Sequence, residues 1–176
     1  MIKSIWIIGP SQSGKTTLAK LVLDRLRRHG LQSLHVDGDD IRNLREAKLG
    51  FDVASRRKQT AHVMRHAQWI IKQDALPVVA IIHPFEDDRA RCRKDLEGYF
   101  EVYLKCDMQE LIRRDTKKLY LPAMKGKKKH VVGVDIPFDP PQNSDLTLES
   151  DYLTPDQLVA ALWLKIVDKI PTPHKS

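Results

Sequence analysis

Short apolar runs alternate with longer amphipathic segments along this chain. Runs rich in Ile, Val and Leu predict strands at residues 5–8, 33–36, 76–82, 100–104 and 146–148. Between them, apolar residues recur at helical spacing, which predicts helices at residues 16–29, 56–74, 88–97 and 108–114. A last helix is expected after Thr154, because Thr154, Pro155 and Gln157 form the sequence signature of a helix N-terminus.

The order of these elements predicts an α/β fold. Strands that alternate with helices form a three-layer, doubly wound parallel sheet with helices on both faces. The run at 76–82 is almost continuously apolar, as expected of a central strand that is covered on both sides. In such sheets ligands bind beyond the carboxyl ends of the strands, so the chemistry is expected in the segments that follow them.

Length and hydropathy indicate the domain organisation. At 176 residues the chain is long enough for one domain with a sizeable core and too short for two ordinary ones, and we assign residues 1–170 to it. The stretch at 115–134 is poor in hydrophobic residues and too long for a simple connection, which predicts a mobile lid. Residues 171–176 are expected to form a disordered tail.

A glycine-rich segment follows the first predicted strand. It reads Gly9-Pro10-Ser11-Gln12-Ser13-Gly14-Lys15-Thr16 and fits the Walker A pattern of a P-loop in full. Its glycines let backbone N–H groups turn toward phosphates, and the following helix adds its positive end. A P-loop NTPase fold is therefore expected, with Mg²⁺ held by the Thr16 hydroxyl. The residues expected to bind ATP are Gly9, Ser11, Ser13, Gly14, Lys15, Thr16 and Thr17.

A cluster of carboxylates follows the second predicted strand. Asp37, Asp39 and Asp40 lie within four residues, and a kinase needs a group that orients or deprotonates the acceptor hydroxyl. We assign this catalytic role to Asp39, beside Lys15 on the phosphate, and support of the metal to Asp37. The alternative is a turn in which Asp39 or Asp40 caps the next helix, and both functions can coexist.

Two arginines and a phenylalanine follow the carboxylates. Arg42 and Arg56 could hold an anion through bidentate contacts, and Phe51 could stack a base. Taken alone, they would instead be surface arginines and a core phenylalanine. The N-K-x-D signature of GTPases is absent, so a small-molecule kinase is the simplest interpretation.

The charge balance agrees with a phosphorylated ligand. The chain has 30 Lys and Arg against 23 Asp and Glu, a net charge of +7, which favours anionic partners. No aromatic residues alternate with the lysines at 125–129, so nucleic acid is not expected as a partner. No apolar run approaches the ~20 residues of a membrane span, and Cys92 and Cys106 form no C-x-x-C motif. We expect a cytoplasmic protein with reduced cysteines and no membrane contact.

These motifs occur in the same order in adenylyl-sulfate kinases, which this chain resembles over roughly residues 2–150. Besides the P-loop, the matching segments include Asp37-Gly38-Asp39-Asp40-Ile41-Arg42, Leu49-Gly50-Phe51, Ile82-His83-Pro84-Phe85, Arg114-Asp115-x-Lys117-x-Leu119-Tyr120 and Gly133-Val134-Asp135-x-Pro137-Phe138. The resemblance implies MgATP-dependent phosphorylation of the 3′-hydroxyl of adenosine 5′-phosphosulfate (APS), and a homodimer.

The resemblance also implies roles on the acceptor side. Phe51 would stack the adenine, and Arg42 and Arg56 would hold the phosphosulfate. Ile82 would lend backbone contacts, and residues 117–133 would form the lid. The substrate-binding residues are then Asp39, Arg42, Phe51, Arg56, Gln59, Ile82, His83, Lys117, Lys129 and Val131.

The chain departs from the family pattern on this side. His83 replaces the usual serine and Gln59 an asparagine, and a phosphohistidine is one alternative to a structural or hydrogen-bonding role for His83. Where the family lid reads Lys-Gly-Phe-Thr-Gly, this chain has Lys129-His130-Val131-Val132-Gly133. Valine cannot stack, so about 1–3 kcal/mol is lost by analogy with base–aromatic stacking. Residues 43–48 also differ and place new charges at the pocket mouth.

Three hypotheses follow from these departures. The first is an APS kinase, and His130 could substitute there for the lid phenylalanine. The second is a related kinase with another acceptor, such as cytidine diphosphoramidate in capsule modification. The third is a non-catalytic nucleotide-binding relative, against which the retained Lys15, Asp39 and paired arginines argue.

Overall fold

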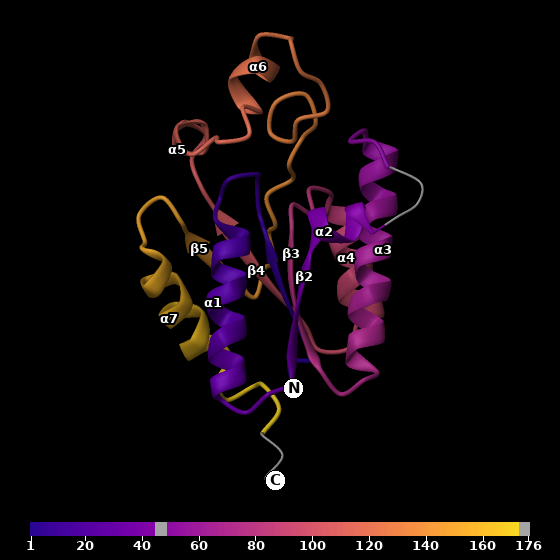
Figure 1. Ribbon diagram of the computed structural model, residues 1–176, viewed down its shortest axis with the longest axis vertical. Coiled ribbons are helices and arrows are strands. Elements are labelled where there is room, and N and C mark those ends of the chain that lie inside the picture. The colour runs from indigo at the N-terminus through magenta and orange to yellow at the C-terminus, as the bar shows by residue number, and fades with distance from the viewer. Residues whose placement is uncertain (45–48, 173–176) are drawn as a thin grey trace.

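The computed structural model describes residues 1–44 and 49–172, which contain a five-stranded sheet (Figure 1). The strands are β1 (Ser4–Ile8), β2 (Ser33–Asp37), β3 (Leu76–Ile81), β4 (Tyr99–Lys105) and β5 (Leu146–Glu149). They run parallel in the order β2-β3-β1-β4-β5. The helices are α1 (Lys15–Arg28), α2 (Gly38–Asn43), α3 (Val53–Ile71), α4 (Glu86–Asp95), α5 (Met108–Arg113), α6 (Tyr120–Met124) and α7 (Pro155–Ile166).

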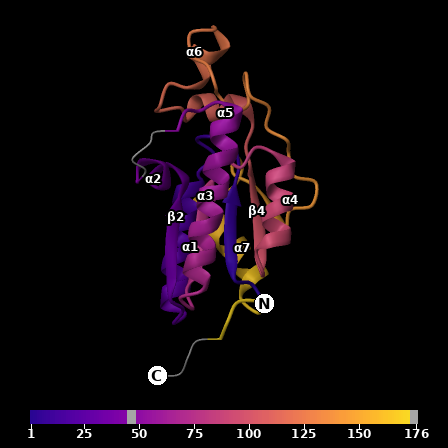
Figure 2. The ribbon, with the colours of Figure 1, turned by 90° about the vertical axis from the view of Figure 1, so that its right-hand side faces the viewer.

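Helices cover both faces of the sheet, which confirms the predicted three-layer architecture. α1 and α7 lie on one face, and α3 and α4 lie side by side on the other (Figures 1 and 2). In β1, Ile5 and Ile7 pack into the cluster with α1 and α7, whereas Trp6 and Ile8 pack into the cluster with α3 and α4. Both sides of the strand face apolar surroundings, which explains why its sequence is continuously apolar rather than alternating.

The predicted strands are confirmed to within one residue at each end. The helices differ more. α3 begins and ends three residues earlier than predicted, because the side chain of Asp52 caps it by accepting a hydrogen bond from the Ser55 N–H at 2.9 Å. At the other end, Asp74 adopts φ +56° and turns the chain toward β3.

Two short helices, α2 and α6, are absent from the sequence prediction because each is too short to show a helical period. The first also corrects the predicted cap. Asp37, not Asp39 or Asp40, is the N-cap of α2, since its carboxylate accepts from the Asp39 N–H at 2.9 Å.

The segment predicted as a lid, residues 115–134, is called the flap below. It lies beyond the carboxyl ends of the strands and contains α6 (Figure 1). Tyr120, Ala123 and Val131 of the flap pack with Leu111 of α5 in a small apolar cluster of their own. The flap is therefore a folded unit despite its polar composition, and its mobility stays a prediction.

Two predictions fall on residues 45–48 and 173–176, which lie outside the described part of the chain. One is the prediction that residues 43–48 place new charges at the pocket mouth, and the other is the prediction of a disordered tail at 171–176. Most of each segment lies outside the described residues. None of the helices in the described residues combines the length and apolar composition needed to cross a membrane. Cys92 is buried and Cys106 half-buried, and both are free thiols, as expected.

Residues near the two ends of the described chain lie together at the amino ends of the strands, opposite the flap. The N–H of Ile2 donates to the carbonyl of Lys169 at 2.7 Å. Figure 1 shows this end of the molecule far from α6.

Truncation of Leu162 tests the packing of α7 against the sheet. Leu162 is 0% exposed and belongs to the core cluster with α1, so Leu162→Ala should lower the free energy of unfolding by about 2–5 kcal/mol in urea. Leu164 lies on the same helix but is 79% exposed, and Leu164→Ala should change stability by less than about 0.5 kcal/mol. Equal losses in the two variants would contradict the assigned burial of α7.

Candidate active site

The P-loop leaves β1 through a close backbone contact. Gly9 has φ +150°, and a Cβ atom there would lie 2.5 Å from the carbonyl oxygen of Leu104 in β4. The N–H of Gly9 donates to the carbonyl of Ile82 at 3.3 Å, which ties the loop to the end of β3. Gly14 at φ +94° then starts α1 in the left-handed region. Glycine is required at both ends of the turn, as the Walker A pattern predicts.

Lys15 is the first residue of α1, and its ammonium group is held inside the loop. Its Nζ donates to the carbonyl of Pro10 at 2.5 Å. Burial lowers the pKa of Lys15 to about 8, against the opposing effect of the carboxylates of Asp37 and Asp39. An incoming phosphate would replace the single carbonyl as the partner of this charge.

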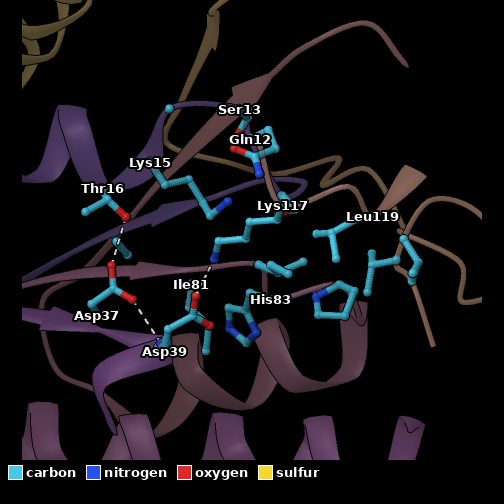
Figure 3. A pocket seen from close by; sticks show the side chains of 18 of the residues that line it. Gln12, Ser13, Lys15, Thr16, Asp37, Asp39, Ile81, His83, Lys117 and Leu119 are labelled. Carbon is cyan, nitrogen blue, oxygen red and sulfur yellow. Dashed lines mark hydrogen bonds and ion pairs between the residues drawn. The ribbon is translucent and has the colours of Figure 1, made fainter. Parts of the chain in front are cut away.

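Thr16 and Asp37, which the sequence predicts as ligands of Mg²⁺, lie side by side. The Thr16 hydroxyl donates to Oδ2 of Asp37 at 2.8 Å, while Oδ1 caps α2 (Figure 3). A hydroxyl and a carboxylate beside a phosphate-binding loop fit Mg²⁺, which takes few protein ligands and completes its shell with phosphate and water. The observed hydrogen bond shows that the two oxygens are close enough to serve one ion.

Asp39 faces the flap from the start of α2. Its Oδ2 accepts from Nζ of Lys117 at 2.8 Å. Desolvation alone would raise the pKa of Asp39, but the hydrogen bond and charge of Lys117, with Lys15 and Arg42, lower it below its usual value. Asp39 is therefore a carboxylate, and Figure 3 shows Lys15 and Lys117 extending toward each other above it.

Arg42, Phe51 and Arg56 gather at the other side of the pocket. The Arg42 guanidinium lies 4.6 Å from the centre of the Phe51 ring, and its Nη1 donates to the carbonyl of Gly50 at 2.6 Å. Arg56 donates from Nε to the carbonyl of Phe51 and from Nη2 to the carbonyl of His130, both at 2.8 Å. Phe51 is 53% exposed, so it is not a core residue.

One cavity of about 860 Å³ connects these groups. Except for Gly9, the first residue of the P-loop, all the predicted ATP- and substrate-binding residues line it. At the end away from Phe51 it is lined by residues that the sequence analysis did not assign to the site: Arg114, Ser150, Leu153, Pro155 and Leu158. The Arg-Asp pair at 114 and the helix start at Thr154 were visible in the sequence, but neither indicates that the segment faces a pocket.

Gln59 and His83 lie in the floor of this cavity. Gln59 is 3% exposed, and its Nε2 donates to the carbonyl of Gly38 at 2.7 Å. His83 is fully buried against Trp6, with ring centres 5.5 Å apart, and burial lowers its pKa to about 3. Its imidazole is neutral and both ring nitrogens are inaccessible, so the geometry lends no support to a phosphohistidine.

Val131 stands where the sequence comparison expects the family's lid aromatic, and His130 precedes it. Val131 is 6% exposed and packs inside the flap cluster, so its side chain contributes to the flap rather than to a base. The N–H groups of His130 and Val131 both donate to the carboxylate of Asp135 at 2.6 Å, which fixes this turn. His130 has an exposed side chain and φ +64°, and its carbonyl is the one that holds Arg56.

Residues 2–149 match the sequence profile of the adenylylsulphate kinase family. The chain belongs to this family. It is therefore an ATP-dependent phosphotransferase that acts on a hydroxyl group, as the sequence predicts. A probable adenylyl-sulfate kinase of Bacillus subtilis is 36% identical over 149 residues, covering 84% of this chain and 75% of that one. One of Pyrococcus abyssi is 32% identical over 154 residues and 88% of both chains.

Solved structures agree with this family assignment. The APS kinase of Mycobacterium tuberculosis, in complex with AMPPNP and APS, superposes with a TM-score of 0.87 at 31% identity, over 94% of this chain and 98% of that one. Shikimate kinase from Aquifex aeolicus, with a TM-score of 0.59 and 14% identity, shares the fold alone.

The lowered pKa of Lys15 gives nucleotide binding a pH dependence. Phosphate should raise this pKa, so binding takes up a proton above about pH 8, and affinity falls by up to about tenfold per pH unit there. Calorimetric titration with a non-hydrolysable MgATP analogue, from about pH 7.5 to 9.5, should show both effects. Lys15→Met should remove the dependence. A wild-type affinity that is flat over this range would contradict the assignment.

Proposed function

We propose that this enzyme phosphorylates the ribose 3′-hydroxyl of adenosine 5′-phosphosulfate with MgATP. The observation that carries the proposal is one continuous cavity, with the P-loop on one side and Arg42, Phe51 and Arg56 on the other. Asp39 stands between these halves. The superposition with a structure described as holding both AMPPNP and APS supports the same pair of substrates.

The donor half of the site would hold and polarise the phosphates of ATP. N–H groups of the P-loop and the N-terminus of α1 would face the β- and γ-phosphates, and Lys15 would neutralise their charge. Thr16 and Asp37 would hold Mg²⁺, which supplies charge neutralisation at the phosphate oxygens when bound. Arg114 and the apolar residues Leu153, Pro155 and Leu158 would receive the base of ATP.

The acceptor half would orient the attacking hydroxyl. Asp39 is a carboxylate of low pKa, so its main task is to accept the hydrogen bond of the 3′-hydroxyl and direct the oxygen in line with the γ-phosphate. In a loose transition state for phosphoryl transfer, the hydroxyl loses little of its proton before the new bond forms. A weak base is therefore sufficient. Lys117 contacts only Oδ2 of Asp39, so Oδ1 would accept from the hydroxyl, and the charges of Lys117 and Lys15 would help to neutralise the transferring group.

Arg42 and Arg56 would bind the phosphosulfate. Hydrogen bonds to backbone carbonyls already hold both guanidinium groups beside Phe51, so little side-chain freedom is lost on binding. Burial lowers the pKa of Arg56, and the charge of Arg42 adds to this effect. Two arginines that destabilise each other's charge gain more from an anion than isolated ones would.

A pyrimidine acceptor such as cytidine diphosphoramidate is the second candidate. The observation in its favour is the burial of Val131 in the flap cluster, which leaves Phe51 as the single Phe, Tyr or Trp among the described residues that line the cavity. A pyrimidine has a smaller ring surface than adenine, so it loses less stacking free energy when the second aromatic side chain is missing.

Release of ADP across a panel of acceptors tests the proposal. The panel holds adenosine, cytidine, guanosine and uridine 5′-phosphosulfates and the matching diphosphoramidates. Turnover with APS and weak turnover with the others is the expected result. A strong preference for a cytidine compound would transfer the assignment to the second candidate. ATP binding without stimulation by any acceptor would favour a non-catalytic relative. The homodimer and the cytoplasmic location stay predictions.

Substitution of Asp39 tests the mechanism. Asp39→Asn should lower kcat by about a hundredfold or more, because a neutral amide oxygen accepts a weaker hydrogen bond than a carboxylate and orients the hydroxyl less firmly, while ATP affinity changes by less than about threefold. Asp40→Asn is the matched control, since Asp40 is exposed and does not line the cavity. Near-normal turnover in Asp39→Asn would remove Asp39 from the mechanism.

A further inference from the structure

Tyr120 connects the flap to the ATP-binding loop. Its side chain is 0% exposed, and its hydroxyl donates a hydrogen bond to the carbonyl oxygen of Ser11 at 2.8 Å. Ser11 lies in the middle of the P-loop, 109 residues earlier in the chain. The bond therefore joins two segments that are brought together only by the fold.

This bond fixes one peptide unit of the P-loop. The carbonyl of Ser11 and the N–H of Gln12 belong to the same planar trans peptide group and point in opposite directions. A fixed carbonyl therefore also fixes the direction of the N–H. Gln12 has φ +68°, a conformation that residues other than glycine keep only with support from their surroundings. A loop that binds phosphate through N–H groups needs these units held in one orientation.

Asp115 holds Tyr120 in place for this contact. Its Oδ2 accepts from the N–H groups of Leu119 and Tyr120, at 2.6 and 2.8 Å, which fixes the start of α6. Its Oδ1 lies 3.5 Å from Nε2 of Gln12, at the long limit for a hydrogen bond. Ser11 and Gln12 are thus both contacted from the flap, with the bond of Tyr120 as the stronger of the two contacts.

The flap also contacts the acceptor half of the site. Lys117 pairs with Asp39, and the carbonyl of His130 accepts from Arg56. A folded segment that is bonded to both halves of a cavity can respond to occupancy of either one, and such coupling acts equally in both directions.

We propose that Tyr120 is a positioning residue: its hydroxyl orients the Ser11–Gln12 peptide unit for nucleotide binding and couples the flap to the P-loop. The inference rests on the ATP site of the proposed function and is independent of the acceptor. Tyr120 touches no phosphate itself and acts through the backbone of the loop.

Tyr120→Phe removes the hydroxyl and keeps the ring in the apolar cluster. Loss of one neutral hydrogen bond to the loop should raise the Kd of a non-hydrolysable MgATP analogue about three- to tenfold in calorimetric titration. Tyr103→Phe is the matched control, because the Tyr103 ring stacks on Phe138 and its hydroxyl has no hydrogen-bond partner in residues 1–44 and 49–172. A Kd equal to that of the wild type, or an equal rise in both variants, would overturn the proposal.

Hydrogen exchange separates positioning from a general loss of stability. In the wild type, saturating nucleotide should slow the exchange of the α6 amides, and in Tyr120→Phe this protection should be largely lost at equal saturation. Full nucleotide-dependent protection in the variant would overturn the coupling, whatever its melting temperature. Neither measurement uses an acceptor. A negative acceptor panel therefore counts against the proposed function alone, and an unaffected Tyr120→Phe against the role of Tyr120 alone.

Discussion

The close passage of Gly9 over the end of β4 is the constraint on which the site depends. Its backbone lies against the carbonyl of Leu104, in the strand next to its own, where a side chain has no space. The chain leaving β1 can therefore curl tightly enough to start α1 above the sheet edge. Because all the strands are parallel, the segments that follow β2, β3 and β4 arrive at the same edge. The carboxylates, the cavity floor and the flap meet the P-loop for this reason.

The electrostatics of the site depend on the desolvated ammonium group of Lys15. This group has the carbonyl of Pro10 as its hydrogen-bond partner, whereas Lys117 and Asp39 form an exposed ion pair beside it. An anion would therefore stabilise the Lys15 ammonium, because burial penalises an ammonium group that lacks a full counter-charge. A triphosphate supplies that charge. Without its ligand, the site therefore keeps a positive charge that the protein itself does not fully neutralise.

The sequence was sufficient to predict features that depend on the spacing of hydrophobic residues or on the backbone freedom of glycine. The continuous apolar run at residues 76–82 identified an interior strand, which lies between β2 and β1, and the spacing of Gly9 and Gly14 identified the phosphate loop. It was insufficient where the outcome depends on packing between distant segments. The polar composition at 115–134 concealed a small core, which consists of three buried flap side chains and Leu111 with half-buried hydrophobic residues packed against them. The alternative role of Asp39 or Asp40 as the cap of α2 is wrong, because Asp37 is the cap and its choice requires knowledge of the end of β2 to within one residue.

Ile2 and Lys169 bring the two ends of the domain within one hydrogen bond of each other, at the edge opposite the cavity. A short linker between them would join the chain into a ring without crossing the site. New ends could then be opened in the exposed loop beside Gln142, which does not line the cavity. Domains with adjacent ends and an exposed loop commonly accept such circular permutation. The order of elements along this chain is therefore less important to the active site than their arrangement around the sheet.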